Sequence, residues 1–422
     1  MTPEVKERIE QIRHGIVPEG YKKTKAGIVP REWTEYTIGE CLERVERPVD
    51  VQADEMYTQI GIRSHGKGLF YKEPVTGTIL GNKAVYWVEP DCFVLNIVFA
   101  WEQAVSKTTQ NEVGMIGSHR FPMYRPIDSR VDVDYLITYM LTKRGKDILE
   151  AASPGGAGRN RTLGQERFMK SKIILPSVEE QRRIAETLTA QNKTIELKEK
   201  LLAEKQSQKK YLMQQLLTGK KRLPGFDGEW RNVKLNEVLV ERKEKNATQD
   251  HRICSVAVQK GVVDQIEHLG RSYAATDTSN YGVAHYGDII YTKSPTGDFP
   301  YGIIKQSQMN EEVAVSPLYG IYEPVCYEMG YLLHTYFSYA ANCTNYLLPI
   351  IQKGAKNTIN ITNDVFVSNK LYLPMEQGEQ KALAEIFITA DSEIELLRQS
   401  IEQEKQKKKA LMQLLLTGVV RV

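Results

Sequence analysis

An internal repeat constrains the fold of this chain more than any other feature of its 422 residues. The string KKYLMQQLLTG at 209–219 returns as KKALMQLLLTG at 408–418, which is 199 residues later and differs at two positions. The similarity extends backwards without a gap, since EEQRRIAETL at 179–188 matches GEQKALAEIF at 378–387. A repeat of this length predicts two copies of one structural unit instead of a single core.

Each copy is predicted to be a mixed domain followed by a long helix. EWTEYTIGECL at 32–42 matches EWRNVKLNEVL at 229–239, so the similarity starts with the domains. Short apolar and β-branched stretches predict strands, and 133–150 and 329–342 each read as one helix. The expected fold class is α+β, with two tandem mixed α/β domains. The expected regions are an N-terminal helix and arm at 1–30, domain 1 at 31–176, a central spacer helix at 177–222, domain 2 at 223–374 and a C-terminal spacer helix at 375–422.

The two long helices are predicted to pair with each other. Apolar residues recur at coiled-coil spacing, a proline precedes each helix, and a glycine ends it. Polar residues interrupt both stripes, which favours mutual packing as an antiparallel coiled coil with pseudo-two-fold symmetry, each helix spanning roughly 55–60 Å. The alternative is that each helix packs on its own domain. The predicted seam consists of Ile184, Leu188, Ile195, Leu202, Leu212, Leu216, Leu383, Phe387, Ile394, Leu397, Ile401, Leu411 and Leu415.

Composition sets broad limits on the class of protein. A net charge of +3 permits nucleic-acid binding without indicating it, so any basic surface must be local. The longest apolar stretch, 92–101, is too short to span a bilayer, and the first residues form no signal sequence, so we expect a cytoplasmic protein without a membrane partner. The cysteines, Cys41, Cys92, Cys254, Cys326 and Cys343, are scattered and predict reduced core thiols.

Several motifs imitate catalytic elements but lack an essential residue. GIRSHGKG at 61–68 resembles a phosphate-binding loop, yet Gly68 stands where Ser or Thr would hold magnesium. SPLY at 316–319 lacks the second proline of the methyltransferase SPPY element, and no glycine-rich cofactor loop lies nearby. The seven histidines show no metal-ligand spacing, and no cysteine has a nearby histidine signature. We therefore expect no catalytic residue, metal site or cofactor in this chain.

The layout suits a protein that reads an extended partner. Two related domains on a spacer of this length can contact duplex DNA about one to two turns apart. LPSVEEQRRIAETL with KKYLMQQLLTG, repeated as LPMEQGEQKALAEIF with KKALMQLLLTG, resembles the specificity subunit of type I restriction-modification systems. FAWEQAV at 99–105 is similar to the Trp-Gln-Gly-Ala stretch of target-recognition domains, from which 102–104 depart, and 57–70 is similar to the family too.

The resemblance implies a division of labour. Each mixed domain would be a target-recognition domain for one half of a bipartite, asymmetric double-stranded DNA target. The helices would dock two methylation subunits, which bind S-adenosylmethionine and methylate adenine N6 after base flipping. Two restriction subunits, which translocate and cleave DNA, could join them. The rival interpretations are a coiled-coil protein scaffold, an enzyme with its own methyltransferase site, and the recognition subunit of a related phage-defence system.

DNA contacts are expected on exposed loops rich in Arg, Lys, Asn, Gln and Ser, because these side chains pair with base edges and phosphates. The candidates in domain 1 are Arg63, Ser64, His65, Lys67, Gln103, Ser106, Lys107, Ser118, His119, Arg120, Arg159, Asn160 and Arg161. Those in domain 2 are Gln259, Lys260, Lys293, Ser294, Thr296, Lys353, Lys356 and Asn357.

Overall fold

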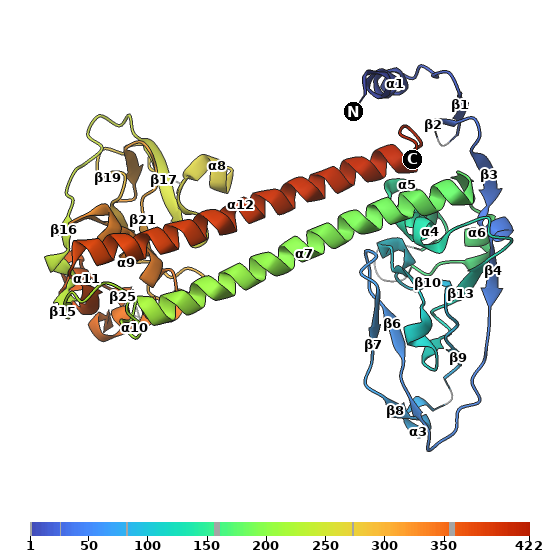
Figure 1. The fold of residues 1–422 in the computed structure, drawn as a ribbon, viewed down its shortest axis with the longest axis horizontal. Helices are drawn as coiled ribbons and strands as arrows, with labels where there is room; N and C mark the ends of the chain where they lie inside the picture. Colours follow the sequence, from blue (N-terminus) through green and yellow to red (C-terminus); the bar gives the residue numbers. More distant parts are fainter. Residues whose placement is uncertain (1, 26, 82, 156–160, 272–273, 354–358) are drawn as a thin grey trace. The chain divides into compact units, whose positions relative to one another are not determined.

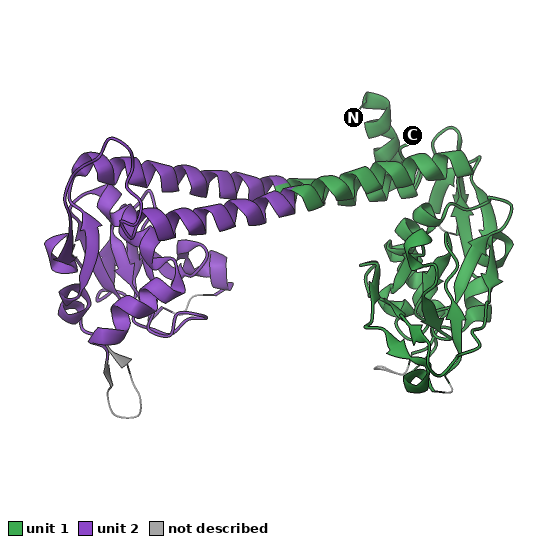
Figure 2. Cartoon of the chain, turned by 60° about the horizontal axis from the view of Figure 1, so that its bottom comes forward, with its two compact units in different colours: residues 1–197, 401–422 green, residues 198–400 purple. Residues whose placement is uncertain are grey.

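A computed structural model describes residues 2–25, 27–81, 83–155, 161–271, 274–353 and 359–422. The chain forms two compact units (Figure 2). Unit 1 comprises residues 1–197 and 401–422, and unit 2 comprises residues 198–400. Unit 2 is therefore one continuous stretch of chain, whereas unit 1 is assembled from two.

Unit 1 is built mainly from short strands (Figure 1). Its helices are α1 (Pro3–Arg13), α2 (Ile38–Cys41), α3 (Gly77–Leu80), η1 (Ala100–Glu102), η2 (Gln110–Glu112), α4 (Val133–Met140), α5 (Lys143–Ala151), α6 (Gln165–Lys170) and the first part of α7 (Val178–Leu216). Its strands are β1 (Tyr21–Thr24), β2 (Gly27–Pro30), β3 (Thr34–Thr37), β4 (Leu42–Val45), β5 (Met56–Tyr57), β6 (Ile60–Ile62), β7 (Leu69–Tyr71), β8 (Val75–Thr76), β9 (Val85–Trp87), β10 (Phe93–Leu95), β11 (Val105–Lys107), β12 (Ile116–Ser118), β13 (Met123–Pro126) and β14 (Lys172–Leu175).

Unit 2 has the same kind of composition. Its helices are η3 (Leu235–Glu237), α8 (Gln265–Leu269), α9 (Tyr327–Phe337), α10 (Ala340–Leu347), η4 (Leu348–Ile350), α11 (Asn363–Ser368), the second part of α7 and most of α12 (Gln377–Leu416). Its strands are β15 (Trp230–Lys234), β16 (Leu239–Glu241), β17 (Arg252–Ala257), β18 (Gly261–Asp264), β19 (Gly282–Ala284), β20 (Ile289–Tyr291), β21 (Ile304–Gln306), β22 (Val313–Val315), β23 (Gly320–Pro324), β24 (Gln352–Lys353), β25 (Ile359–Asn360) and β26 (Lys370–Pro374).

The strand order repeats between the units, as the sequence repeat predicts. A four-stranded sheet runs β11-β10-β13-β4 in unit 1 and β21-β20-β23-β16 in unit 2. A separate antiparallel pair, β3 with β14 and β15 with β26, leads into each long helix. Unit 2 adds a sheet of order β18-β17-β22-β19, and unit 1 has the matching pairs β6-β7 and β9-β12, joined by a parallel bridge between Gln59 and Ile116.

Each stretch predicted as one helix is in fact two helices. Residues 133–150 fall into α4 and α5, and 329–342 into α9 and α10. In unit 1 the break lies at Thr142, whose hydroxyl accepts a hydrogen bond from the Gly145 N–H at 3.1 Å and so caps α5. A Cβ at Gly145 would lie 2.3 Å from the Tyr139 carbonyl oxygen, so glycine is what allows α5 to follow α4 this closely.

The long helices pair in antiparallel fashion within each unit. In unit 2 the Lys198 ammonium donates to Ser400 at 2.7 Å and the Lys205 ammonium meets Glu393 at 2.7 Å, so rising numbers on α7 meet falling numbers on α12. In unit 1 the Gln191 amide donates to the Glu404 carboxylate at 2.7 Å. The predicted seam residues Ile184, Leu188, Ile195, Leu216, Leu383, Phe387, Ile394, Ile401 and Leu415 are buried, and Leu202, Leu212, Leu397 and Leu411 are half-buried.

The helices also pack on the domains, so both alternatives raised by the sequence hold. Ile184 and Leu188 share the main core of unit 1 with Leu415 and Leu416. In unit 2, Leu383 and Phe387 form a cluster with α9 and the end of α7. The five cysteines are free and four are buried, as expected of core thiols. Among the described residues, no helix is long and apolar enough to cross a membrane.

A glutamine closes the turn from strand to long helix in both units. In unit 1 the Gln181 amide donates to the carbonyl oxygens of Pro176 and Arg130, each at 3.0 Å, and its oxygen accepts from the Asp132 N–H at 2.9 Å. In unit 2 the Gln380 amide donates to the Pro374 carbonyl at 2.9 Å. The repeated Glu-Gln pair after each proline therefore has a structural cause, because the glutamine satisfies backbone groups that the turn leaves unpaired.

The glutamate of the same pair receives the end of the other long helix. In unit 1 the Arg421 guanidinium, beyond the end of α12, donates to the buried Glu180 carboxylate and, at 3.0 Å, to Glu32. In unit 2, Arg222, beyond the end of α7, donates from two nitrogens to the fully buried Glu379, each at 2.8 Å. In each unit, the segment after the end of one long helix is therefore joined by an ion pair to the first turn of the other.

Candidate functional site

The basic loop between β6 and β7 is the most exposed candidate surface of unit 1. Arg63, His65 and Lys67 are exposed, and His65 has the left-handed φ of 60°. Glu102 fixes the position of the loop. The His65 N–H donates to the Glu102 carbonyl at 2.9 Å, and the Ser64 hydroxyl donates to the Glu102 carboxylate at 2.8 Å. The P-loop look-alike is therefore a hairpin turn that presents three basic side chains to solvent.

Aromatic side chains line a hollow of about 380 Å³ beside this loop. Phe70, Phe99 and Phe121 form its apolar walls, and Lys72 adds a charge. The Arg63 guanidinium lies over the Phe70 ring, 5.1 Å from its centre. Rings flanked by cations suit contact with nucleotide bases and phosphates. Sequence reasoning missed these phenylalanines, although Phe99 stands in the FAWEQAV stretch and Phe70 ends the other family-like stretch.

Three further predicted residues lie next to residues that line the hollow or to their neighbours in the chain. His119 and Arg120 are exposed and directly precede the lining residue Phe121. The Arg161 guanidinium lies over the Trp101 ring at 5.5 Å from its centre, next to the lining residue Glu102. Segments far apart in the sequence therefore meet on one surface of unit 1. Of the same predicted loop as Arg161, residues Arg159 and Asn160 lie outside the described residues.

Other predicted residues of domain 1 serve the fold. The Gln103 amide donates to the Met140 carbonyl at 2.8 Å, so this side chain ties η1 to the end of α4. Ser106 is buried with 8% exposure. The Lys107 ammonium lies 2.9 Å from the Asp134 carboxylate and 3.7 Å from that of Asp91. Ser118 is half-buried and accepts from the Arg120 N–H at 3.3 Å. These positions give Ser106 no route to a partner outside the fold.

In unit 2 the matching hairpin has a different chemistry. Gln259 and Lys260 are exposed at the turn between β17 and β18, the counterpart of the β6-β7 turn. Ser294 and Thr296 are exposed between β20 and β21. Lys293 in the same loop is half-buried, and this burial lowers the pKa of its ammonium group. The predicted Lys353 belongs to β24, and Lys356 and Asn357 lie outside the described residues.

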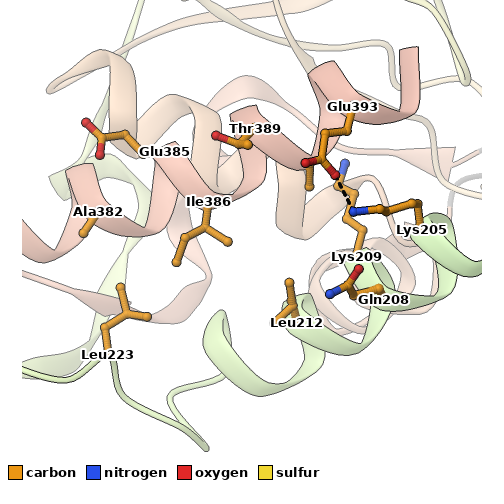
Figure 3. A pocket seen from close by; sticks show the side chains of 11 residues that line it. Lys205, Gln208, Lys209, Leu212, Leu223, Ala382, Glu385, Ile386, Thr389 and Glu393 are labelled. Atoms are coloured by element: carbon orange, nitrogen blue, oxygen red, sulfur yellow. Dashed lines mark hydrogen bonds and ion pairs between the residues drawn. The ribbon is translucent and has the colours of Figure 1, made fainter. Parts of the chain in front are cut away.

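The long helices carry a second kind of candidate surface. In unit 2 an open groove of about 550 Å³ runs between α7 and α12 (Figure 3). Leu212, Leu223 and Ile386 line its apolar part, and the Lys205–Glu393 ion pair bounds it. Leu197 on α7 and Leu396 on α12 are 58% and 65% exposed. They stand at matching places in the sequence repeat, so each helix presents an apolar residue at the same place.

Comparison with known proteins finds similarity to type I restriction-modification proteins. Residues 30–205 match the family model of the type I restriction modification DNA specificity domain. The type I restriction enzyme MjaVIII specificity subunit of Methanocaldococcus jannaschii is 24% identical over 436 residues, covering 96% of each chain. The chain is therefore similar, over its first mixed domain and along its whole length, to type I specificity subunits.

Solved structures of type I specificity subunits share the fold along almost the whole chain. The HsdS subunit from Thermoanaerobacter tengcongensis has 17% identity and a TM-score of 0.51, covering 93% of this chain and 98% of that one. The type I restriction-modification S subunit from M. genitalium has 12% identity and a TM-score of 0.56, covering 91% and 96%. A chain described in work on complex assembly of a type I restriction-modification system has 17% identity and a TM-score of 0.54, covering 93% and 99%. The predicted fold class is thereby confirmed.

Proposed function

We propose that this chain is a specificity subunit that reads a bipartite, asymmetric double-stranded DNA target, one half with each mixed domain. The observation that carries the proposal is the repeated strand order with unlike side chains at matching turns. Arg63, His65 and Lys67 occupy the β6-β7 turn, and Gln259 and Lys260 the β17-β18 turn. Since arginine favours guanine edges and glutamine favours adenine, unlike turns favour unlike half-targets.

The hollow in unit 1 supports the same proposal. The exposed cations Arg63, Lys67 and Arg120 can contact phosphates or base edges, and the neighbouring phenylalanine rings can contact apolar base surfaces. A net charge of +3 for the whole chain makes such local clusters the main electrostatic attraction for DNA. The target bases themselves depend on which of these side chains reach the groove.

We also propose that the helices dock two copies of a methylation subunit. Exposed leucines at repeat-related positions, Leu197 and Leu396, favour two equivalent contacts with one kind of partner. The groove at Leu212, Leu223 and Ile386 adds apolar surface in unit 2. S-adenosylmethionine and the chemistry at adenine N6 would belong to that partner, and restriction subunits would join the complex for cleavage. Such an assembly would work where chromosomal DNA lies, in the cytoplasm.

A methylation map tests the recognition proposal. The chain is co-expressed with the methylation subunit encoded beside it, and N6-methyladenine is mapped across the genome with the chain present and deleted. We expect a bipartite motif with a fixed gap to vanish on deletion. An unchanged map, with both proteins made, would favour the scaffold interpretation, which predicts no DNA affinity, whereas DNA recognition predicts binding that weakens steeply with salt.

Substituted leucines test the docking proposal separately. Leu197→Glu and Leu396→Glu should each reduce the mass of the purified complex by one methylation subunit, and the double variant by two. Gln206→Glu, at an exposed site on α7, is the matched control because it adds the same charge without removing an apolar contact. Complexes of unchanged mass in the double variant would move the docking site elsewhere.

A further inference from the structure

Four neighbouring segments of unit 2 bring two histidines and two glutamates to one end of the β18-β17-β22-β19 sheet. Arg252 pairs with Val313 in parallel register, and Val313 pairs with Ala284 in antiparallel register. One residue beyond these pairs, at the same edge of the sheet, lie His251, Glu312 and His285, which therefore form a row. The segment carrying Glu244 runs along the far side of β19, where its carbonyl accepts from the Val283 N–H at 3.1 Å.

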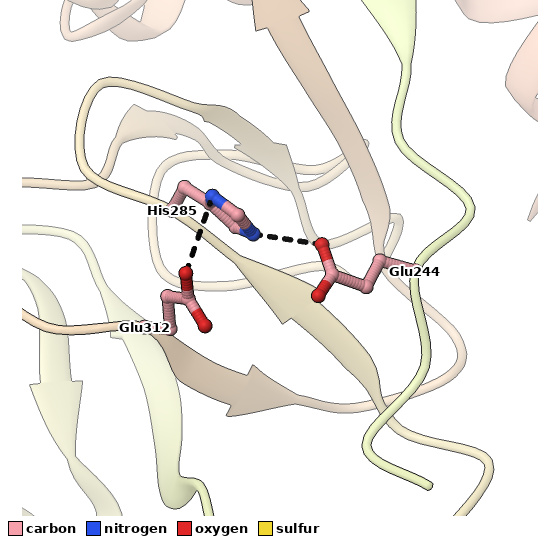
Figure 4. A group of neighbouring side chains, drawn as sticks. All are labelled: Glu244, His285 and Glu312. Carbon is pink, nitrogen blue, oxygen red and sulfur yellow. Dashed lines mark hydrogen bonds and ion pairs between the residues drawn. The ribbon is translucent and has the colours of Figure 1, made fainter.

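The four side chains contact one another along this row (Figure 4 draws Glu244, His285 and Glu312). His285 Nε2 lies 2.7 Å from a Glu244 oxygen, and its Nδ1 lies 3.7 Å from a Glu312 oxygen. The other Glu312 oxygen lies 3.3 Å from His251 Nε2. One ligand atom from each of Glu244, His285 and Glu312 fits within 4.8 Å of the other two.

A buried amide sets the tautomer of His251. The side chain of Asn246 is fully buried, and its NH₂ group donates to the Thr278 hydroxyl at 3.2 Å. Its oxygen accepts from the His251 backbone N–H at 3.4 Å and faces His251 Nδ1 at 2.9 Å, so Nδ1 carries the hydrogen. In a neutral ring Nε2 is then an acceptor, yet it faces a carboxylate oxygen. A cation between Nε2 and the carboxylate, either a proton or a metal ion, would satisfy both acceptors.

We propose that Glu244, His285 and Glu312 bind one divalent transition-metal ion of the zinc class, with His251 beside the Glu312 carboxylate. Imidazole nitrogens and carboxylate oxygens form the mixed ligand set that Zn²⁺ takes, whereas magnesium and calcium take oxygen alone. Metal–ligand bonds of about 2.0–2.2 Å in a tetrahedron separate the ligand atoms by about 3.3–3.6 Å. One ligand atom from each of the three residues lies within 4.8 Å of the other two, so the side chains must draw together by about 1 Å to reach that range. His251, which Asn246 holds in place, is then an outer partner of the Glu312 ligand, as such second-layer groups are in zinc sites.

The ion would act on the fold of domain 2. It would fasten the ends of β17, β19 and β22 to the segment at Glu244, four stretches that are separate in sequence. Its location at the edge opposite the β17-β18 turn leaves Gln259 and Lys260 free for another partner. The inference is independent of the proposed function, because it concerns only residues inside unit 2.

Metal binding to the full chain, purified without a histidine tag and treated with a chelator, tests the proposal. Titration calorimetry with Zn²⁺ should give one ion per chain, and Co²⁺ should give the visible absorption of a tetrahedral nitrogen–oxygen site. His285→Gln and Glu312→Gln should each weaken Zn²⁺ binding more than about 100-fold, beyond the effect of losing an outer partner. Zn²⁺ should also slow amide hydrogen exchange in β17 and β22.

His268→Gln is the matched control, since His268 is exposed on α8 of the same unit and stands outside the row. It should bind Zn²⁺ like the unchanged chain. Glu312 is about half exposed, so Glu312→Gln keeps the test valid if His285→Gln fails to fold. Absence of Zn²⁺ binding, or equal binding by both ligand variants and the unchanged chain, would overturn the metal site and leave protonated histidines clamped between carboxylates.

Discussion

Units 1 and 2 share a strand order but fill the same places with different chemistry. At the closure of the long helices, unit 2 joins Arg222 to a fully buried Glu379, which also accepts from the Trp230 indole N–H at 2.8 Å. In unit 1, Arg421 reaches Glu180, but the buried indole N–H of Trp33 has no hydrogen-bond partner among the described residues. The repeat therefore preserves the ion pair and leaves its surroundings free to diverge.

The sheet edge that carries the proposed metal site shows the same divergence. The bridge of Lys245 with Gly282 in unit 2 corresponds to that of Pro48 with Tyr86 in unit 1. In this register Arg47 of unit 1 is equivalent to Glu244 of unit 2, and Glu89 is equivalent to His285. Arg47 and Glu89 form an ordinary ion pair. In unit 1 an arginine–glutamate ion pair stands at this sheet edge, and in unit 2 the proposed metal ligands stand there. The shared backbone therefore accommodates either set of side chains.

Removal of the buried carboxylates, Glu379 and Glu180, should produce the largest difference in stability between the two units. Glu379→Ala should destabilise unit 2 by about 3 kcal/mol, because it leaves the buried Trp230 indole N–H unpaired and leaves Arg222 only the carbonyls of Gly228 and Phe226. Glu180→Ala should cost unit 1 only about 1–2 kcal/mol, since Arg421 is 38% exposed and keeps Glu32. Hydrogen exchange of β26 and β14 reports the two units separately. Glu385→Ala and Glu186→Ala, the exposed repeat-related pair, are controls expected near zero.

A buried lysine distinguishes the units next. Lys305 of β21 is 5% exposed, and its counterpart by strand register is Ser106 of β11. Burial lowers the pKa of the Lys305 ammonium to about 8. Below pH 8 the folded state must keep this charge buried, so Lys305→Met should stabilise unit 2 by up to about 3 kcal/mol at pH 7.

The sign of its pH dependence follows from the same pKa. Between pH 8 and the unfolded value of 10.5 the unfolded chain binds more protons than the folded one, so the stability of the unchanged chain rises with pH. The advantage of Lys305→Met should therefore shrink across that window in urea unfolding followed by hydrogen exchange. Lys260→Met, at an exposed turn, should show no such window. A constant difference from pH 7 to 10.5 would contradict the prediction.

Base recognition should separate the two domains at the level of the target. If Arg161 reads a base, Arg161→Ala should cost about 1–3 kcal/mol and relax one position, in the half-target of domain 1 only. Methylation maps of the variant and of the exposed control Arg167→Ala measure this. A motif unchanged at every position would remove Arg161 from the base-reading set and leave its stacking on Trp101 as its role.

The smallest expected effect is a loss of DNA affinity that should be the same for both domains. Lys67→Ala and Lys260→Ala remove exposed cations from the two matching turns. If these lysines contact phosphates, each change should weaken DNA binding equally for all sequences and lower the salt slope by about one. Binding of the assembled complex to target and non-target duplexes at several salt concentrations provides the measurement. An effect confined to one target sequence would indicate base contact at that lysine.

The repeat allowed the fold to be predicted, because matching strings set both helix ends and both domains without any knowledge of contacts. The candidate site was harder, since residue type alone cannot separate Arg120, which is exposed, from Ser106, which the sheet covers. The Arg421–Glu180 closure was missed, although Arg222 and Glu379 repeat at the same spacing. The row at His285 could not be found from local spacing, because its members come from four separate segments.

The division of the chain has a consequence for biosynthesis. Unit 2 is complete once residue 400 has left the ribosome, whereas unit 1 must wait for residues 401–422, although it begins first. The nascent first domain therefore exposes the α7 face at Ile184 and Leu188 while the whole second copy is translated. Domains usually fold in their order of synthesis. Here unit 2, which is synthesised later, has all of its residues before unit 1 does. The speed of translation through residues 198–400 therefore sets how long unit 1 lacks residues 401–422.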